Sequence, residues 1–320
     1  MRIPNRVAVL GAGLSGAAAA RDLMRAGFDV VVLDKSRGVG GRMATRRVPG
    51  RDLAFDHGAQ FMRARGTAFA AQIEDWRARG VVAPWGGHDR FVGTPTMTAP
   101  ARDILAGLDV RAGMTVTGIA RDADGWHVSA AEGAITEAFG AVAIGFPAPQ
   151  TFRLLEASGL ALPGIETVTY APCWSLMLAL DGPAAFPESD RRDRDGPIAA
   201  VIRDESRPGR PPGTRLLVHA GPDWSRRHLE DAREAVAEAL LAELAILLGQ
   251  SIVPAYASAH RWRYALVETA LGQDCLYDPT LGLGACGDWC LGPRIEAAFD
   301  SGTALAARIA ADLAAGSEGI

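Results

Sequence analysis

The chain has 320 residues and a formal net charge of −4, with 48% hydrophobic and 22% charged residues. This composition is typical of an ordinary globular protein, and the small negative charge gives no field that would attract nucleic acid or an anionic membrane surface. No run reaches the roughly 20 apolar residues of a membrane span and no signal peptide precedes the first strand, so we expect a cytoplasmic protein. The four cysteines show no spacing typical of zinc, and we expect no metal site.

The first predicted elements form a strand–turn–helix–strand unit. An apolar, β-prone run over residues 6–10 predicts a buried strand, which leads directly into the turn GAGLSG at residues 11–16. A helix is predicted over 17–26, and a second buried strand over 30–33 ends at Asp34. A GxGxxG pattern therefore lies between a strand and a helix, and an acid closes the second strand.

This unit predicts a dinucleotide site, although a glycine turn without a ligand is the alternative. Gly11 permits the tight turn, Gly13 lets a pyrophosphate approach the backbone, and Gly16 lets the helix pack close to the strand. The helix N-terminus offers free N–H groups to the phosphates, and Asp34 is placed to accept hydrogen bonds from an adenosine ribose. The cofactor residues predicted here are Gly11, Gly13, Leu14, Ser15, Gly16, Asp34 and Lys35.

A second glycine loop, KSRGVGGRM, follows Asp34 directly. Gly40 and Gly41 would let the backbone bend over a phosphate that Arg42 would neutralise; taken alone, the segment could also be an arginine-rich surface loop. The succession of GxGxxG, acid and GGRM resembles the FAD-binding opening of the flavin amine oxidase superfamily, which includes monoamine oxidases, phytoene desaturases and renalases. The resemblance implies FAD as the cofactor and adds Gly41, Arg42 and Met43 to its contacts.

The same resemblance implies the fold. We expect an α/β protein in which an FAD-binding Rossmann-like domain carries a second, α+β substrate domain, with the topology of p-hydroxybenzoate hydroxylase and monoamine oxidase. The FAD-binding domain is predicted over residues 1–66, 91–150 and 272–320. The substrate domain is predicted over residues 67–90 and 151–271.

The stretch DHGAQF, residues 56–61, resembles the D-x-G-A-Q segment that lies beside the flavin ring in this superfamily. The resemblance places Ala59, Gln60 and Phe61 near the isoalloxazine. The alternative is a simple turn leading into an amphipathic helix, which is predicted over 67–79.

The following segment continues the FAD-binding domain. Residues 90–97 resemble a G-x-P-G-M element of bacterial renalase-like proteins, with Thr96 where glycine is usual. In the family, the strand predicted over 114–120 contacts the adenine through its backbone, and Val116 is our choice for that contact. The other elements predicted here are a short helix over 99–106 and strands over 125–131 and 138–145.

From about residue 150 the sequence pattern changes and indicates a second domain. Strands are predicted over 170–180, 198–202 and 215–220, and one long helix over 226–248. The later segment AYASAHRWRYA concentrates His260, Arg261, Trp262 and Tyr264, and on a strand their alternation would aim one set into a cavity and the other away. We predict pocket positions for His260 and Trp262; core aromatic residues are the alternative.

The C-terminal part returns to the cofactor. An apolar strand closes on Gly287 and Asp288, and a helix is predicted from Arg294 to about residue 315. This arrangement resembles the second FAD signature of the superfamily, with Ala297 in the place of a glycine. The cofactor residues implied here are Gly287, Asp288, Arg294, Ile295, Glu296 and Ala297. A further GxGxxG at residues 282–287 is interpreted as a decoy, because we expect no helix immediately after it.

The resemblance to bacterial renalase-like proteins spans the whole chain, through DKSRGVGGRM, GAQF, HAGPDWS, AHRW and CGDWCLGPRIEA. It implies oxidation of misreduced dihydronicotinamide isomers to NAD(P)⁺, with O₂ as the acceptor and H₂O₂ as a product. Lys35, the sole lysine, belongs to the adenosine end, and no flavin-linking cysteine motif is evident, so we expect non-covalent FAD.

The residues predicted to position the donor ring are Gln60, His219, His260 and Trp262. Arg261 or Arg65 would offer charge to substrate phosphates. An amine oxidase or another FAD-dependent oxidase of small molecules is the runner-up, and a non-catalytic flavin-binding redox sensor is the third possibility.

Overall fold

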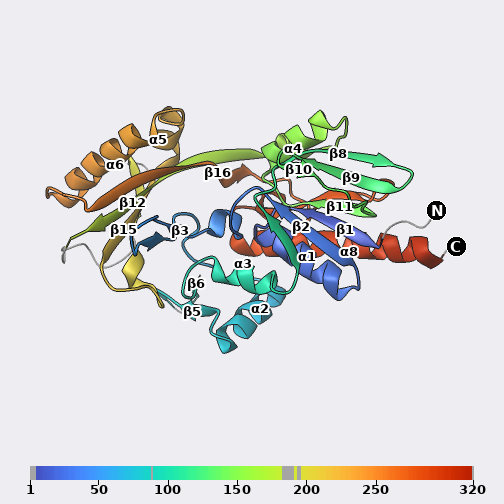
Figure 1. Cartoon of the computed structure of the whole chain (residues 1–320). Helices are drawn as coiled ribbons and strands as arrows, with labels where there is room; N and C mark the ends of the chain where they lie inside the picture. Colours follow the sequence, from blue (N-terminus) through green and yellow to red (C-terminus); the bar gives the residue numbers. More distant parts are fainter. Residues whose placement is uncertain (1–4, 88, 182–190, 193–195, 319–320) are drawn as a thin grey trace.

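The computed structural model describes residues 5–87, 89–181, 191–192 and 196–318 of the chain. Figure 1 shows two lobes, with the long strands β12 (Thr169–Leu180) and β16 (Tyr256–Thr269) running from one to the other. The N- and C-termini lie together at the end of the lobe that contains β1.

The first lobe is built on a six-stranded sheet. From edge to edge its strands are β17 (Leu276–Asp278), β18 (Leu283–Ala285), β11 (Ala141–Ile144), β1 (Arg6–Leu10), β2 (Asp29–Asp34) and β7 (Asp109–Ala112). All neighbours pair in parallel except β17 and β18, which are antiparallel. The two ends of the sequence therefore meet in one sheet, where β11 alone separates β1 from β18.

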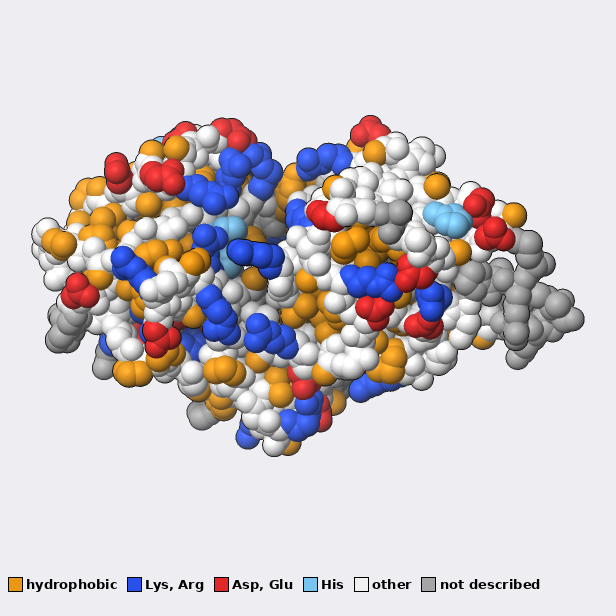
Figure 2. All heavy atoms as spheres, viewed as in Figure 1, with side chains coloured by type: hydrophobic (Ala, Val, Ile, Leu, Met, Phe, Trp, Pro, Cys, Tyr) orange, Lys and Arg blue, Asp and Glu red, His pale blue; other side chains and the backbone are white. Residues whose placement is uncertain are grey.

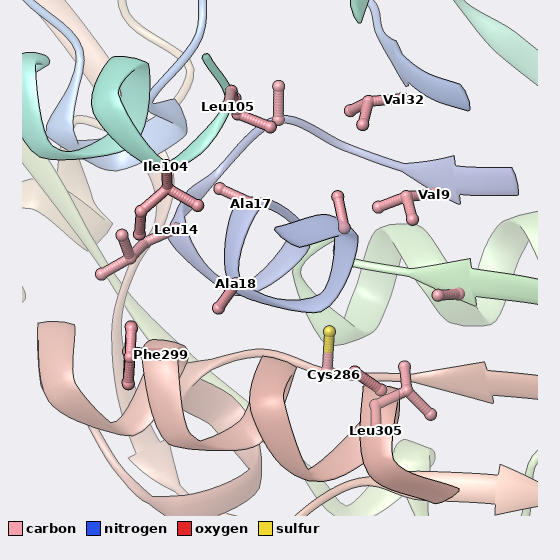
Figure 3. Close-up of a cluster of buried hydrophobic side chains, with 14 of the residues drawn as sticks. Val9, Leu14, Ala17, Ala18, Val32, Ile104, Leu105, Cys286, Phe299 and Leu305 are labelled. Atoms are coloured by element: carbon pink, nitrogen blue, oxygen red, sulfur yellow. The ribbon is translucent and has the colours of Figure 1, made fainter. Parts of the chain in front are cut away.

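Side-chain alternation along β1 creates two core layers, one on each face of this sheet. Val7 and Val9 pack toward the helices α1 (Leu14–Arg25) and α8 (Ile295–Glu318), and Figure 3 shows part of this layer, including Ala17, Cys286 and Leu305. Ala8 and Leu10 pack toward the other layer. Its elements are β8 (Val116–Asp122), β9 (Gly125–Ala130), β10 (Gly133–Ala134) and α4 (Ala148–Ala157).

Helix α8 crosses α1 at very short range. A Cβ atom placed on Gly302 would lie 2.1 Å from the backbone oxygen of Ser15, so only glycine fits at this crossing. Helix α2 (Thr67–Ala78) packs Phe69 on Phe299 in the core layer of α1 and α8, with ring centroids 5.2 Å apart. This contact ties α2 to the first lobe, whereas the sequence prediction assigns residues 67–90 to the substrate domain. The domain boundaries stay a prediction.

The second lobe is built on an antiparallel five-stranded sheet. Its order is β13 (Arg191–Arg192), β14 (Ile198–Arg203), β15 (Thr214–Ala220), β12 and β16. Helix α6 (Arg233–Leu248) covers one face, and the short hairpin of β3 (Arg46–Arg47) and β4 (Ala54–Phe55) covers part of the other. The remaining elements are β5 (Val82–Pro84), β6 (Phe91–Gly93), α3 (Ala99–Ile104), α5 (Pro222–Arg227), α7 (Asp288–Leu291) and the 3₁₀ turns Gly41–Met43, Ile165–Thr167 and Asp204–Ser206.

Two sequence predictions about these elements are wrong, and one helix was missed. The helix predicted over 226–248 is two helices, α5 and α6, because the chain turns after His228, whose carbonyl accepts a 2.9 Å hydrogen bond from Trp174 Nε1. Helix α4 was missed because Pro147 and Pro149 indicate a break in regular structure, yet proline is tolerated at the N-cap and in the first turn of a helix, where these two lie. The short helix α7 follows the GxGxxG of residues 282–287 at once, contrary to our expectation.

Candidate active site

The first glycine loop presents open backbone at the carboxyl end of β1. Gly11 has φ of +106°, and a Cβ atom on Gly16 would lie 1.9 Å from the Gly11 oxygen, so both glycines are required by the turn. Gly13 is different: a Cβ atom there would meet nothing within 4 Å. The space above Gly13 is therefore open, as an approaching pyrophosphate requires.

Helix α1 starts from this loop with its N-terminus uncapped. Gly13 makes no side-chain cap, the first turn has no acidic residue, and the first helical hydrogen bond joins Ala17 N to Gly13 O at 2.8 Å. The N–H groups of Leu14, Ser15 and Gly16 therefore precede the helical ladder. Backbone donors at the positive end of a helix dipole suit a phosphate.

Asp34 lies beside this loop, as predicted. One carboxylate oxygen accepts from Ala12 N at 2.6 Å and the other from Ser36 N at 2.7 Å. These two bonds fix the carboxylate and leave it lone pairs for a ribose. Met114 N donates to Asp34 O at 2.9 Å and so brings the start of β8, where Val116 lies, to the same end. Lys35 is exposed next to Asp34.

The second glycine loop packs directly on the first. Gly40 N donates to Ala12 O at 2.8 Å, and a Cβ atom on Gly41 would lie 3.3 Å from Gly13 Cα. Met43 turns inward and is only 3% exposed, in the core layer of α1. The predicted contact of Met43 with the cofactor therefore has no support from its side chain.

Arg42 and Asp288 join the two predicted FAD signatures across 246 residues of sequence. The Arg42 guanidinium donates to both Asp288 carboxylate oxygens, at 2.8 and 2.6 Å, and to Ala265 O at 3.3 Å. Burial opposes the charge of Arg42, but the nearby Asp288 carboxylate outweighs it, and the pKa of Arg42 is raised above its usual value. Arg42 thus neutralises a carboxylate of this chain, and a phosphate would have to share it.

The acidic residue at the start of α8, Glu296, forms hydrogen bonds within the protein. Glu296, which is 3% exposed, accepts hydrogen bonds from the backbone N–H groups of Arg65 and Gly66, both at 2.7 Å. Ala297 is fully buried, whereas Arg294 is exposed. Gly287 and Ile295 border the same turn, with Gly287 N donating to Ser301 Oγ at 3.1 Å. The Glu296 carboxylate therefore fixes the backbone at Arg65 and Gly66, which follow the DHGAQF stretch.

A row of polar side chains crosses the second sheet and faces the DHGAQF stretch. On β12, Ser175 lies opposite both His219 of β15 and His260 of β16, so the three share one face. The His57 ring lies 4.6 Å from that of His260 and 4.9 Å from that of Trp262, and Trp262 Nε1 donates to His57 O at 2.9 Å. Strand pairing therefore brings the predicted residues of the second domain to this stretch.

His57 was missed by the sequence analysis, although it lies inside a motif that we quote. Burial lowers the pKa of His57 to about 4, and burial followed by His57 lowers the pKa of His260 to about 3. Both imidazoles are neutral at pH 7. Nδ1 of His57 and Oγ of Ser175 are buried and have no hydrogen-bond partner within the described ranges, so both can serve a bound molecule or water.

Gln60, which is 9% exposed, completes the cluster of side chains that we call the pocket: His57, Gln60, Ser175, His219, His260 and Trp262. Gln60 Nε2 donates to Asp56 O at 3.0 Å and Gly58 O at 2.5 Å and lies 3.3 Å from His219 Nε2, while Gln60 Oε1 accepts from Arg207. Gly58 must be glycine, because a Cβ atom would lie 2.0 Å from Arg42 O, to which Ala59 N also donates. Gln60 and the GGRM loop are therefore fixed together.

Phe61 lies under two cations, with the Arg63 and Arg90 guanidinium carbons 5.3 and 4.8 Å from its ring centroid.

Arg261 is not in the pocket: it points to the opposite face of β16, where it pairs with Glu230 at 2.8 Å. The interpretation of Arg261 as a phosphate contact is therefore wrong, for the reason of strand alternation. Arg65 is exposed and stays a candidate for that contact.

Figure 2 shows lysine and arginine side chains gathered across the middle of one face, around a hollow in which histidine is visible. Within the residues that the structure describes, no cluster of three or more histidine, cysteine, aspartate or glutamate side chains is arranged to hold a metal ion. Over the same residues, no helix has the length and apolar character needed to cross a membrane.

Comparison with known families agrees with this arrangement. Residues 9–88 match the NAD(P)-binding Rossmann-like domain, and residues 74–310, well over half of the chain, match the flavin containing amine oxidoreductase family. The lysine-specific histone demethylase 1 homolog 3 proteins of Oryza sativa subsp. indica and subsp. japonica are 47% identical over 60 residues. That match covers 18% of this chain and only 7% of the length of either relative.

Solved structures share the fold over nearly the whole chain. A protein of Exiguobacterium sp. 255-15, described as a candidate protoporphyrinogen oxidase, aligns with a TM-score of 0.78 at 13% identity and covers 96% of this chain and 98% of that one. Cyclohexylamine oxidase from Brevibacterium oxydans IH-35A aligns with a TM-score of 0.70 at 13% identity, over 98% and 100%. The predicted fold class, a Rossmann-like domain with a second α+β domain, is confirmed.

Proposed function

The chain belongs to the flavin containing amine oxidoreductase family, and we propose that it is a renalase-like FAD-dependent oxidase of dihydronicotinamide isomers. Family membership makes it a flavin-dependent oxidoreductase. The finer proposal has two parts: the cofactor is non-covalent FAD, and the donor is a misreduced dihydro-NAD(P) that is returned to NAD(P)⁺, with O₂ reduced to H₂O₂.

The glycine loops fit FAD. The open space above Gly13, the N–H groups at the start of α1 and the fixed carboxylate of Asp34 match a pyrophosphate and a ribose in that order. When bound, the flavin accepts hydride from the donor and passes the electrons on. Non-covalent binding is supported by the cysteines, since burial raises the pKa of Cys173 and of Cys290 to about 12 and suppresses their thiolates at neutral pH.

The observation that carries the choice of donor is the weak basicity of two imidazoles of the pocket, His57 and His260. An alkylammonium ion must lose a proton before hydride leaves its carbon, whereas a dihydronicotinamide needs no deprotonation. His57 and His260, with pKa values of about 4 and about 3, are poor bases for an ammonium ion. Asp56 is 2% exposed, and its carboxylate is already bound by Arg210, the Thr45 hydroxyl and Met97 N. The sole lysine, Lys35, lies at the predicted nucleotide end, so neither residue is placed to act as the base.

The charges around the pocket support a phosphorylated donor. The charged groups that act on His260, after burial and His57, are Arg46 at the start of β3 and Arg233 at the start of α6, and both are exposed. Cations near a binding site attract an anionic dinucleotide and repel an alkylammonium ion. The same arginines favour neutral imidazoles beside a ring that becomes a pyridinium ion.

An anaerobic donor screen tests the proposal. Purified holo-protein is mixed with 2-dihydro-NAD, 6-dihydro-NAD and primary amines that include cyclohexylamine, and the visible absorbance of the flavin is followed. We expect both isomers to bleach the flavin and the amines to leave it oxidised, and admission of O₂ to restore the colour with formation of H₂O₂. Rapid bleaching by amines would establish the amine oxidase alternative, and bleaching by no donor would favour the redox sensor.

A further inference from the structure

Arg46, the first residue of β3, is an exposed cation beside the pocket whose charge no carboxylate matches. Strand β3 pairs with β4 so that Arg46 lies directly opposite Phe55, two residues before His57. Within the described ranges, no ion pair or hydrogen bond engages the Arg46 side chain. We propose that Arg46 is a specificity-determining residue that binds the phosphate nearest the nicotinamide ring of the donor. The inference rests on the dihydronicotinamide donor proposed above.

The residues just before Arg46 hold it beside the DHGAQF stretch. The backbone of Ala44 is hydrogen-bonded to the His57 ring. The Thr45 hydroxyl donates to Asp56 Oδ1 at 2.6 Å. Since these two contacts lie immediately before Arg46 in the chain, β3 is fixed next to a residue whose ring forms part of the pocket.

Strand pairing also gives the direction of the Arg46 side chain. Residues directly opposite each other in an antiparallel pair point to the same face, so Arg46 and Phe55 share one face of the hairpin. Phe55 is fully buried, and its ring stacks on Tyr256 of β16 with centroids 5.7 Å apart. Arg46 therefore faces the strand that carries His260. Burial chiefly lowers the pKa of His57 and of His260, and the charge of Arg46 adds to the lowering of both.

A phosphate is the acceptor that suits this position. In a dihydronicotinamide nucleotide, one ribose separates the ring from the first phosphate, so a ring held in the pocket carries that phosphate close to it. An arginine can donate two parallel hydrogen bonds to a phosphate. Arg42 is already paired with Asp288 at 2.6 Å, whereas Arg46 has no such partner to give up. An alkylamine carries no anion, so this contact would separate the two classes of donor.

Arg47 provides a matched control one residue away. It is exposed like Arg46, and no ion pair or hydrogen bond engages it within the part of the chain that the structure describes. It lies opposite Ala54, on the other face of the hairpin. Arg46→Met and Arg47→Met therefore remove the same charge from the same hairpin and differ in the face from which it is removed.

The test is equilibrium binding of nicotinamide riboside and nicotinamide mononucleotide, in their oxidised forms, to the FAD-bound full chain. The two ligands share the ring and the ribose and differ only by the phosphate. We expect Arg46→Met to raise the Kd for the mononucleotide about tenfold, through loss of a charge-assisted contact, and to leave the Kd for the riboside unchanged. Arg46→Lys, which keeps the charge without the fork, should lie between Arg46→Met and wild type. Arg47→Met should keep both wild-type values.

An unchanged mononucleotide Kd in Arg46→Met would overturn the proposal. An equal rise for the riboside would also overturn it, because that result indicates a disturbed pocket rather than a lost phosphate contact. The measurement needs no turnover, so its outcome is separate from that of the donor screen. If dihydronicotinamides bleach the flavin but Arg46→Met binds the mononucleotide normally, only the assignment of Arg46 fails. If the shift is found but no dihydronicotinamide bleaches the flavin, the phosphate contact stands and the oxidase proposal fails.

Discussion

The two ends of the candidate active site are built in different ways. The predicted nucleotide end is formed by backbone groups. Glycines at positions 11, 13 and 16 shape a turn, and the uncapped N–H groups of α1 lie beside the open space above Gly13. The pocket end is formed by side chains. His57, His219 and His260 come from three segments of the chain and are brought together by strand pairing. The first end can be damaged by one methyl group, whereas the second depends on neutral, correctly oriented polar groups.

The largest expected effect comes from a methyl group inside the glycine turn. In Gly16→Ala the new Cβ would lie 1.9 Å from the Gly11 oxygen, so the turn must open. We expect a loss of about 3 kcal/mol in the free energy of unfolding, measured by urea denaturation, together with loss of FAD. A variant as stable as wild type would show that the turn is not under this constraint.

Gly13→Ala separates cofactor binding from folding at the same loop. Gly13 has φ of −72°, which alanine adopts, and nothing lies within 4 Å of the new methyl group. Stability of the apo-protein should change by no more than about 0.5 kcal/mol. FAD affinity, measured by titration of apo-protein, should fall roughly tenfold or more because the methyl group occupies pyrophosphate space. Gly38→Ala, also in open space, is the control that should keep both.

Arg42→Met tests the ion pair that joins the two signatures. It leaves Asp288, which is 6% exposed, without its cation, and we expect a loss of about 2 kcal/mol in unfolding free energy. In the double variant Arg42→Met, Asp288→Asn the unpaired charge is gone, so part of that loss should return. Additive losses in urea denaturation would mean that the pair contributes nothing.

Acid should weaken the pocket end specifically. His57 and His260 are held neutral in the fold, with pKa values of about 4 and about 3, whereas their unfolded value is about 6.5. Below pH 6.5 the unfolded chain binds protons that the fold excludes, so stability falls as the pH drops from 6.5 toward 4, by roughly 1 kcal/mol per pH unit for each of the two histidines. His57→Asn with His260→Asn should flatten this dependence; an equal slope in the variant would contradict the assignment.

His260→Ala should affect the reaction and not the cofactor. Loss of the ring opens space beside His57 and Trp262, and we expect flavin reduction in stopped-flow mixing to slow roughly tenfold with FAD retained. His127→Ala, on the β8–β9 hairpin, is the matched control with unchanged kinetics. Unchanged kinetics in His260→Ala would remove His260 from the pocket.

The smallest effect is expected at Arg261. Its guanidinium pairs with an exposed Glu230 on the far face of β16, and such surface pairs contribute less than about 1 kcal/mol. Arg261→Ala should leave the reduction rate and the apparent affinity for an anionic donor unchanged. A rise in the donor Kd would return Arg261 to the phosphate contacts.

The nucleotide end was predictable because it is local. Strand, turn, helix and acid are consecutive from Arg6 to Asp34, and the glycines report backbone requirements directly. Helix boundaries were harder: α4 begins at a proline pair that also reads as a breaker, and the end of α5 depends on Trp174, which is far away in sequence.

The pocket end was predictable only in part. The alternation of His260 and Trp262 indicates one face of a strand, but the sequence does not say which face meets the flavin, so Arg261 was misplaced. Arg207 lies in a segment rich in proline, glycine and arginine that reads as exposed, and only the pairing of β14 with β15 buries it against Gln60. Long-range contacts of this kind leave no local signal.

The pH profile of anaerobic flavin reduction tests the central claim, that the pocket takes a donor that needs no deprotonation. With 6-dihydro-NAD as donor, the limiting reduction rate should be flat from about pH 6 to about pH 9, because His57 and His260 stay neutral throughout that range and the donor itself needs no deprotonation. A rate that rises with pH, and that is faster with cyclohexylamine than with the dihydronicotinamide, would contradict the account.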